Sequence, residues 1–301
     1  MKRFPHLRKI YWAGYRWFWK TYATCFPVSA TKTYYKKKLR YVPDLKNPHT
    51  LNEKLQYLKL TEYRHNPLVT QCADKIEVRK YVESVGCAEI LNEVYGVYDF
   101  ATEINWNDLP DTFVIKCNHD SGGILICKEK DTFDTADATQ KLDTWLKARS
   151  GVEHVEFSYE DIKPRILCEK YIDSEDGKPP RDYKIFCSYG EPKLLFVATD
   201  REHGHTKFDY FTPEWEWIDV RNGHPNAGPS VKKPERLDDM LDYARKLSKG
   251  FPIVRVDLYC EFNQIIFGEL TFLHFGGVTP FDPVEYDKTF GDLFPLKGID
   301  A

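Results

Sequence analysis

Apolar and polar positions alternate most clearly over residues 253–260, which predicts a β-strand. Arg255 and Asp257 share one face of this strand, and apolar residues occupy the other face. Residues 265–272 read as a second strand, and the intervening residues 261–264 are polar at both ends, as expected of a turn. The pattern therefore predicts an antiparallel hairpin.

The predicted hairpin gathers polar side chains on one face. Glu269 and Thr271 follow on the return strand, so we expect them to lie beside Arg255 and Asp257. Two neighbouring carboxylates repel each other unless a cation lies between them, and oxygen ligands suit Mg²⁺. The glycine pair 276–277 allows the following loop to approach a substrate closely. The alternative is a hairpin whose charged face meets only water.

The rest of the chain alternates between helical and strand patterns, which predicts an α+β fold. A capping box at residues 50–53 opens one helix, and Asp74 caps a second. The expected helices are 51–60, 74–85, 137–150 and 234–250, and the expected strands outside the hairpin include 112–117, 124–127, 165–172, 182–189 and 193–199.

Length and cysteine usage narrow the class of protein. The 301 residues are enough for two or three packed units. The eight cysteines occur singly, without a CxxC pair, and several stand in apolar strand-like runs. This favours buried free thiols in a reducing cytoplasm over disulfides or a zinc site. We find no apolar run long enough to span a membrane and no signal-peptide pattern.

Charge is unevenly placed along the chain. Residues 1–40 contain eleven lysines and arginines and no acidic residue, whereas the remainder is acidic. Residues 1–24 also place tryptophans and other aromatic residues beside these basic side chains, which is typical of a helix at the surface of an anionic membrane. The alternative is an amphipathic helix packed on the protein's own core. We expect no nucleic-acid partner, because the acidic remainder offers no basic groove.

Two further segments suit nucleotide binding. Lys116 ends a strand before the glycine-containing loop 118–123, where backbone N–H groups can approach phosphate oxygens beside a lysine charge. The strand end at 169–172 can offer backbone groups to a flat heterocycle, and Asp182 beyond it can accept ribose hydroxyls. Each segment also fits a plain structural reading, as a simple hairpin in the first case and as solvated carboxylates in the second.

The order of these segments along the chain is that of a known group of enzymes. In that order they resemble the ATP-grasp superfamily of carboxylate–amine ligases. More closely, the chain is similar to the TupA-like ATP-grasp family, which is named for teichuronopeptide synthesis and found in bacterial polysaccharide gene clusters. The matching stretches, within residues 46–295, are NPHTLNEKLQYLKL, HNPLVTQCADKIEVRKYV, LPDTFVIKCNHDSGG, PRDYKIFCSYGEP, the DR pair at 200–201, and FPIVRVDLY with FGELTF. The stretch CEKYI resembles the adenine-contacting segment of D-alanine–D-alanine ligases.

The resemblance implies an α+β ATP-grasp fold, in which two α+β subdomains enclose ATP, with a basic helical N-terminal region. The implied divisions are a basic aromatic segment at the membrane interface (1–45), an N-terminal α/β region (46–110), a central subdomain (111–172), and a C-terminal subdomain with the metal and acceptor site (173–301).

Position in the matching motifs also implies roles for individual residues. ATP phosphates would contact Lys75, Lys116, Lys184 and the loop residues Asn118, Ser121, Gly122 and Gly123. Adenine and ribose would meet Glu169, Lys170, Tyr171, Ile172 and Asp182. One or two Mg²⁺ ions would bind Asp257, Glu269 and Thr271, the last at a place where many ATP-grasp enzymes have asparagine. The catalytic charges would be Arg255, Lys116 and Lys184, and the acceptor would lie against Arg201, Arg255, His274, Gly276 and Gly277.

The implied function is ATP-dependent amide formation between a sugar carboxylate, such as a uronic acid, and an amino acid or amine. It would proceed through an acyl phosphate, in the synthesis of capsule, O-antigen or teichuronopeptide. The alternatives are a glycosyltransferase of the same pathway and a non-catalytic nucleotide-binding protein. The expected partners are small-molecule or glycan substrates and, through the N-terminus, an anionic membrane or membrane-bound polysaccharide machinery. The expected location is the bacterial cytoplasm, at the inner face of the membrane.

Overall fold

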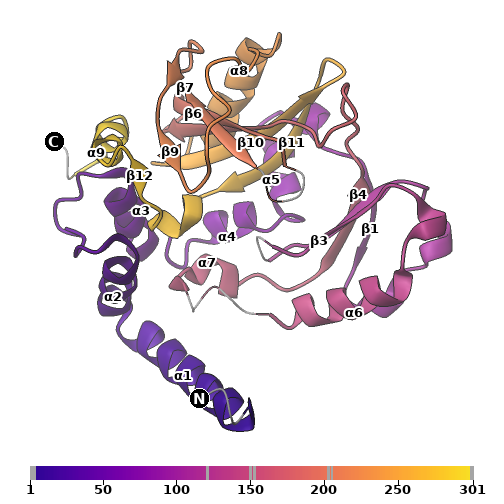
Figure 1. Cartoon of the computed structure of the whole chain (residues 1–301), viewed down its shortest axis with the longest axis horizontal. Coiled ribbons are helices and arrows are strands. Elements are labelled where there is room, and N and C mark those ends of the chain that lie inside the picture. Colours follow the sequence, from indigo (N-terminus) through magenta and orange to yellow (C-terminus); the bar gives the residue numbers. More distant parts are fainter. Residues whose placement is uncertain are drawn as a thin grey trace.

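The structure is a computed structural model that describes residues 5–119, 122–148, 151, 154–201, 204 and 206–298 (Figure 1). Its α-helices are α1 Pro5–Cys25, α2 Pro27–Leu39, α3 Leu51–Leu60, α4 Pro67–Ala73, α5 Val78–Ser84, α6 Thr135–Leu146, α7 Phe157–Glu160, α8 Leu237–Ser248 and α9 Glu285–Asp292. Its strands are β1 Val94–Tyr98, β2 Phe113–Cys117, β3 Ile124–Cys127, β4 Ile166–Lys170, β5 Asp182–Ser188, β6 Glu191–Thr199, β7 Lys207–Phe211, β8 Trp217–Ile218, β9 Arg221–Asn222, β10 Val254–Glu261, β11 Gln264–Thr271 and β12 Phe281–Asp282.

A six-stranded antiparallel sheet, in the order β11-β10-β5-β6-β7-β8, carries the larger core. Helix α8 covers β5, β6 and β10 with its apolar face (Figure 1). Helices α3, α4 and α5 add Leu55, Val69 and Val82 to the same core. The predicted capping box is confirmed at the start of α3, because the Thr50 side chain accepts from the Glu53 backbone N–H and the Glu53 side chain accepts from the Thr50 backbone N–H.

A four-stranded sheet, in the order β1-β4-β2-β3, forms a second and smaller core with α6. Phe113, Ile115 and Ile166 from the strands pack with Leu142 from the helix. Strand β1 pairs antiparallel with β4, so the predicted region 46–110 contributes its helices to the first core and its strand to the second. The α+β organisation follows the pattern predicted from the sequence.

The N-terminal arm, which we define as α1 and α2, extends away from both sheets in Figure 1. Its junction is buried, where Ala23 and Ala30 pack with Val155 and Phe157, and Tyr35 of α2 is fully buried as well. Pro27 begins α2 and separates the two helices. Among the described residues, we find no helix with both the length and the apolar character that crossing a bilayer requires.

All eight cysteines are free thiols, as predicted. Cys25 is exposed at the end of α1, Cys260 is partly exposed, and the others are buried. Burial raises the pKa of Cys72 and of Cys168 to about 12, so these thiols stay protonated at neutral pH.

Candidate active site

Three strands of the six-stranded sheet place charged side chains in a row. Asp257 on β10 is aligned with Glu269 on β11 and with Lys184 on β5. Arg255 is aligned with Thr271 in the same hairpin. Because side chains two residues apart on a strand share a face, these five side chains lie side by side, as the alternating pattern predicts.

A β-bulge at Gly268 sets this alignment. From the turn onward β10 and β11 pair regularly as far as Leu258 and Phe267, and regular pairing would next place Gly268 opposite Asp257. The register shifts by one residue instead, so Glu269 takes that place. A Cβ at position 268 would lie 3.0 Å from the backbone oxygen of Asp257, so this close approach favours glycine. Strict alternation in the sequence did not reveal the bulge.

Arg255 is the centre of the polar network. Its Nε and Nη2 atoms donate hydrogen bonds to the two oxygens of Asp257 at 2.7 and 2.6 Å, and Nη2 also donates to Oγ1 of Thr271 at 2.9 Å. The same Nη2 lies 3.4 Å from Oε1 of Glu269, so one cation bridges the two carboxylates. Burial opposes the charge of Arg255, but the adjacent Asp257 outweighs burial and raises the pKa of Arg255.

The two carboxylates respond differently to burial. At Asp257 burial raises the pKa, and the neighbouring cations only partly offset it. At Glu269 burial acts in the same direction, but three cations outweigh it and lower the pKa to about 2; these are Lys75, Lys184 and Arg255. Glu269 is therefore ionised at neutral pH and can serve as a ligand for a cation.

His274 supports Arg255 from within the core, which corrects its predicted place on the acceptor side. Its ring packs edge-on against Phe186, with 5.1 Å between ring centroids, because the turn after β11 folds back onto the sheet. Arginine can only donate, so Nδ1 accepts from Arg255 at 2.7 Å and protonated Nε2 donates to Oδ1 of Asn222 at 2.9 Å. Burial and nearby cations lower the pKa of His274 well below its ordinary value, so the ring is neutral.

A further group of charges continues from Lys184. Its Nζ lies 2.5 Å from Oδ2 of Asp257 and 2.7 Å from Oδ2 of Asp182. Arg201 approaches the same Asp182 oxygen at 3.4 Å. The second oxygen, Oδ1 of Asp182, is buried and has no hydrogen-bond partner. Asp182 therefore holds Lys184 and Arg201 in place through one oxygen, and its contact with ribose stays a prediction.

A cavity of about 480 Å³, here called the inter-sheet cavity, opens between the two large sheets. Its walls include the predicted base-binding residues Glu169, Lys170, Tyr171 and Ile172, together with Lys116, whose Nζ lies 2.5 Å from Oε1 of Glu169. Arg201 lines this cavity and not the acceptor side, which corrects its predicted role. The chain turns back after β6, and the charge of Asp182 holds the guanidinium there.

A second cavity, of about 580 Å³, is here called the Lys75 cavity. Lys75, Arg255, Glu269 and Thr271 line it together. The structure therefore brings Lys75, which stands far from the hairpin in the sequence, to the same polar site, as the resemblance implies. The two cavities adjoin at the bulge, because Gly268 lines the first and Glu269 lines the second.

Of the predicted glycine pair, only Gly276 lines the Lys75 cavity. The carbonyl oxygens of Gly276 and Gly277 both accept hydrogen bonds from Nε2 of Gln56, at 2.7 and 2.9 Å. Both glycines have positive φ, 64° and 63°, a conformation that favours glycine. Gly277 is buried against α3, so its predicted contact with the acceptor is wrong and its role is to anchor the turn.

Some walls of the Lys75 cavity were missed by the sequence analysis. Tyr34 and Lys38 come from α2, and Glu156 comes from the segment before α7. Oε1 of Glu156 lies 3.1 Å from the position that a Cβ on Gly276 would take. Burial raises the pKa of Glu156 despite the nearby charge of Lys59. These residues stand in no local motif, so only the folded chain reveals them together.

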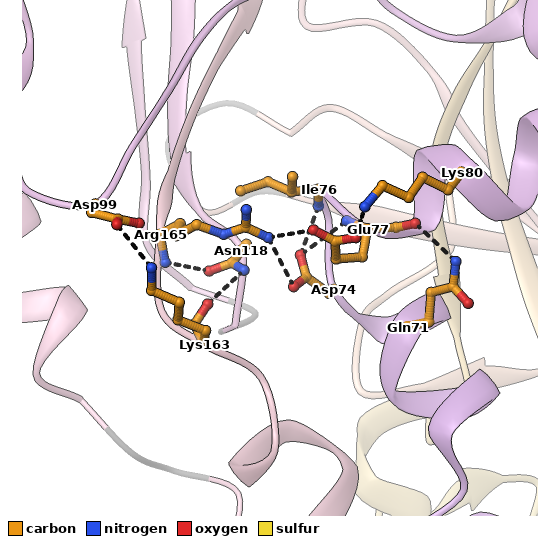
Figure 2. Close-up of polar contacts among 9 residues, drawn as sticks. All are labelled: Gln71, Asp74, Ile76, Glu77, Lys80, Asp99, Asn118, Lys163 and Arg165. Atoms are coloured by element: carbon orange, nitrogen blue, oxygen red, sulfur yellow. Dashed lines mark hydrogen bonds and ion pairs between the residues drawn. The ribbon is translucent and has the colours of Figure 1, made fainter.

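Figure 2 shows how the loop after β2 is anchored at its start. The Asn118 side chain donates to the backbone oxygen of Lys163 at 3.0 Å and accepts from the backbone N–H of Arg165 at 2.7 Å. Its backbone oxygen accepts from the N–H of Lys75 at 3.3 Å. Asn118 is fully buried, so it positions Lys75 and the loop instead of making the predicted contact with ATP. Arg165 adds an ion pair to Glu77 at 2.7 Å.

The predicted cap at Asp74 forms, but a turn separates it from α5, which begins at Val78. Oδ1 of Asp74 accepts from the backbone N–H groups of Ile76 and Glu77 (Figure 2), so a turn precedes α5 and Lys75 stays outside the helix. In the loop itself, Ser121 lies outside the described residues. Gly122 is exposed, whereas Gly123 is buried, with its Cβ position 2.9 Å from the Trp145 ring.

The donor set of the hairpin fits Mg²⁺. Asp257 and Glu269 offer carboxylate oxygens and Thr271 a hydroxyl, and the cationic Arg255 already bridges the two carboxylates. Within the described part of the chain, no cluster of three or more His, Cys, Asp or Glu side chains forms a metal site. Mg²⁺ commonly takes one or two carboxylates and completes its shell with phosphate oxygens and water. Two carboxylates therefore suit a metal that binds together with a nucleotide.

Two α+β units around an inter-sheet cavity, with the charged hairpin on one of them, make up an ATP-grasp fold. The profile of the TupA-like ATP-grasp family matches residues 53–295. The chain therefore belongs to the TupA-like ATP-grasp family. This confirms the predicted family and the predicted α+β ATP-grasp fold.

Several solved structures are similar in fold. The D-alanine–D-alanine ligase from Bacillus anthracis complexed with ATP is 16% identical, with a TM-score of 0.42 over 68% of this chain and 57% of that chain. An N5-carboxyaminoimidazole ribonucleotide synthetase in complex with ADP is 15% identical, with a TM-score of 0.43 over 73% and 50%. An L-amino acid ligase from Bacillus licheniformis is 13% identical, with a TM-score of 0.46 over 86% and 57%. The chain thus spans between half and three-fifths of the length of these proteins. No curated protein matches the chain significantly.

Proposed function

We propose that the chain is an ATP-dependent carboxylate–amine ligase. The observation that carries the proposal is the buried Arg255–Asp257–Glu269 network: Arg255 and Glu269 line the Lys75 cavity, and Gly268, the neighbour of Glu269, lines the inter-sheet cavity. Buried, oriented cations in such a network stabilise negative charge that moves from a nucleotide to a second substrate, because the surroundings screen them weakly. Family membership supports ATP as the nucleotide.

The inter-sheet cavity suits an adenine nucleotide. Ile124 and Ile126 line it and are 51% and 50% exposed, so a flat base can cover apolar surface there. Residues 171 and 172 line it as well and can offer backbone groups to the edge of the base. Lys116 would turn from Glu169 toward the phosphates.

The phosphates would then extend toward the hairpin. Asp257 and Glu269, with Thr271, would hold Mg²⁺, which neutralises phosphate charge when bound. Lys75 and Lys184 add positive charge near Glu269, and both lower its pKa. None of these groups forms a covalent bond, so catalysis would rest on positioning and electrostatics.

The reaction has two steps. A carboxylate oxygen of the first substrate attacks the γ-phosphorus, the bond to the bridging oxygen of ADP breaks, and an acyl phosphate forms. An amine then attacks the acyl carbon, phosphate leaves with the bonding electron pair, and an amide forms. Arg255 is charged and lines the Lys75 cavity, so it can stabilise the oxyanion of each step.

The amine must lose a proton during the second step. Glu156 lines the same cavity, and burial raises its pKa above the ordinary range of a carboxyl group. A carboxylate with a raised pKa is a stronger base, so Glu156 is suited to receive this proton. Lys59 lies within electrostatic range of Glu156 and favours its ionised form.

For the substrates, we propose a sugar carboxylate, such as a uronic acid, and an amino acid or amine, used in bacterial cell-surface polysaccharide synthesis. The size and lining of the Lys75 cavity support this choice. Its volume of about 580 Å³ admits a sugar ring, and Tyr34 and Phe275 offer aromatic faces beside the cationic Lys38 and Lys75.

The test is ADP release from Mg²⁺-ATP with a panel of sugar acids crossed with amino acids. We expect continued, steady-state release that requires both an acid and an amine, with an amide product found by mass spectrometry. Asp257→Asn should abolish it, and the exposed-site control Asp239→Asn should not. Failure to bind Mg²⁺-ATP, or sugar transfer from a nucleotide-sugar without ADP and amide, would overturn the proposal in favour of a glycosyltransferase.

A further inference from the structure

The outer face of the N-terminal arm is aromatic and exposed. Trp17 and Phe18 are 71% and 60% exposed on α1, and Phe26, between the helices, is 61% exposed. The ring of Phe18 lies 6.2 Å from that of the partly buried Tyr22, and the ring of Phe26 lies 5.9 Å from it, between centroids. Helix α1 projects from the protein (Figure 1), so the exposed rings of Trp17, Phe18 and Phe26 present apolar surface that folding leaves uncovered.

The opposite face of the arm accounts for its attachment to the protein. Ala23 and Ala30 are fully buried, and Trp19 and Tyr22 pack partly on this junction. Packing on the protein's own core, the alternative considered from the sequence, therefore accounts for the inner face of the arm only. The exposed rings on the outer face need another explanation.

The charge of the arm favours one occupant for this surface. Lys36, Lys37 and Lys38 are exposed on α2, and residues 1–40 contain no acidic side chain. Aromatic rings at headgroup depth, beside lysines that meet lipid phosphates, are the combination that binds helices to anionic bilayers. A protein partner of neutral surface would gain nothing from this run of lysines.

The same helix reaches the second cavity. Tyr34 and Lys38 of α2 line the Lys75 cavity, with Nζ of Lys38 at 5.7 Å from the Tyr34 ring centroid. The Tyr34 ring also lies 5.8 Å from the His154 ring, between centroids. Helix α2 therefore carries the three exposed lysines and also forms a wall of the Lys75 cavity, where the second substrate would bind.

We propose that the N-terminal arm lies on an anionic lipid bilayer and that the bilayer presents the carboxylate or amine substrate, carried on a lipid anchor, to the Lys75 cavity. The second half of this proposal rests on the ligase function proposed above. The first half does not, because membrane binding by the arm requires no turnover.

The first test is flotation of the full chain with vesicles of phosphatidylglycerol and phosphatidylcholine, and with vesicles of phosphatidylcholine alone. We expect binding to the anionic vesicles that falls as salt rises. Lys36→Glu with Lys37→Glu should weaken binding by about 30-fold or more, and Trp17→Ser with Phe18→Ser by about 10-fold. The matched control Lys232→Glu with Lys233→Glu reverses another exposed lysine pair and should leave binding unchanged.

Equal binding by the arm variants and the control would overturn the proposal. So would self-association of the wild-type chain that is lost in Trp17→Ser with Phe18→Ser, because the rings would then be a contact between copies. All substituted side chains are exposed, and matching thermal melts would confirm that each variant is folded.

The second test compares ADP release with a sugar acid free in solution and with the same acid coupled to a diacyl lipid in anionic vesicles. The arm variants should keep the first rate and lose about 10-fold of the second. Equal loss of both rates would overturn presentation by the membrane. Flotation without ADP release for any pair would instead remove the ligase proposal and leave membrane binding standing.

Discussion

The two large sheets differ in what holds their polar groups. On the six-stranded sheet, Arg255 and Lys184 both form ion pairs with Asp257, whose side chain is 2% exposed. On the four-stranded sheet, one ion pair, Lys116 with Glu169, faces the cavity beside isoleucines that remain half exposed. The charged groups of the six-stranded sheet find their partners within that sheet, whereas the four-stranded sheet exposes apolar surface that a ligand can cover.

This difference assigns different tasks to the two sheets. Moving one member of a buried ion pair leaves the other charge uncompensated, which costs free energy. The six-stranded sheet is therefore suited to hold metal and phosphates in one geometry. Apolar surface next to a single ion pair tolerates movement, so the four-stranded sheet is suited to close over a base. Substitutions on the first should therefore affect folding and turnover together, and those on the second should affect nucleotide binding alone.

The largest effect is expected at the six-stranded sheet. Asp257→Asn should lower turnover by at least about 10³-fold, because it removes a metal ligand and the partner that orients Arg255. It should also lower the free energy of unfolding by about 3 kcal/mol, because Arg255 and Lys184 lose their common buried counter-charge. Steady-state ADP release and urea denaturation measure the two effects. A loss of turnover with an unchanged free energy of unfolding would contradict the expectation that this sheet couples folding to turnover.

Glu156, outside both sheets, tests the chemistry of the Lys75 cavity. Glu156→Gln should slow amide formation by about 10²-fold and leave the amine-independent burst of ADP intact. Since burial raises the pKa of Glu156, its base form is lost as pH falls through that raised pKa, so the wild-type rate should decline on the acid side. The variant should lack this decline in a pH profile. The exposed control Asp161→Asn should behave as wild type, and a lost burst in Glu156→Gln would contradict the assigned role.

A smaller effect is expected from Lys116→Met on the four-stranded sheet. Loss of a charged contact to phosphate should weaken ATP binding by about 10- to 100-fold, measured by calorimetry. The free energy of unfolding should fall by less than in Asp257→Asn, since Lys116 has the one ion-pair partner Glu169, whereas Asp257 pairs with two cations. A destabilisation as large as that of Asp257→Asn would show that the two sheets do not differ in this respect.

The smallest effect is expected from Ile124→Ala, which removes apolar surface facing the inter-sheet cavity. Nucleotide binding should weaken about 5-fold, the effect of about 1 kcal/mol of lost burial, with no change in thermal stability. Val97→Ala is the matched control, because Val97 is 42% exposed on the same sheet but does not line the cavity. Equal effects of both substitutions on binding would remove Ile124 from the nucleotide site.

The sequence predicted what local pattern determines. Alternation placed Arg255 with Asp257 and Glu269 with Thr271, and the hairpin brought the two pairs together. It could not show the bulge, because skipping Gly268 depends on the close approach of two backbones. It also misplaced His274, Gly277 and Asn118, whose partners are distant in the chain.

Motif position identifies a residue without showing which way it points. Asn118 and His274 were predicted to contact ligands, yet the side chain of each forms hydrogen bonds to other residues of the protein. Conversely, Glu156 and Tyr34 stand in no motif and reach the Lys75 cavity only because α2 and the segment before α7 converge there. Such convergence is a tertiary effect, which no short window of sequence can contain.

The uneven burial of the cysteines makes the chain selective toward thiol reagents. Burial raises the pKa of several buried thiols, whereas Cys25 is exposed at the end of α1, next to the rings of the N-terminal arm. A maleimide dye at neutral pH should therefore attach first at Cys25 without any engineered site. An environment-sensitive fluorophore at that position would follow the surroundings of the arm in real time.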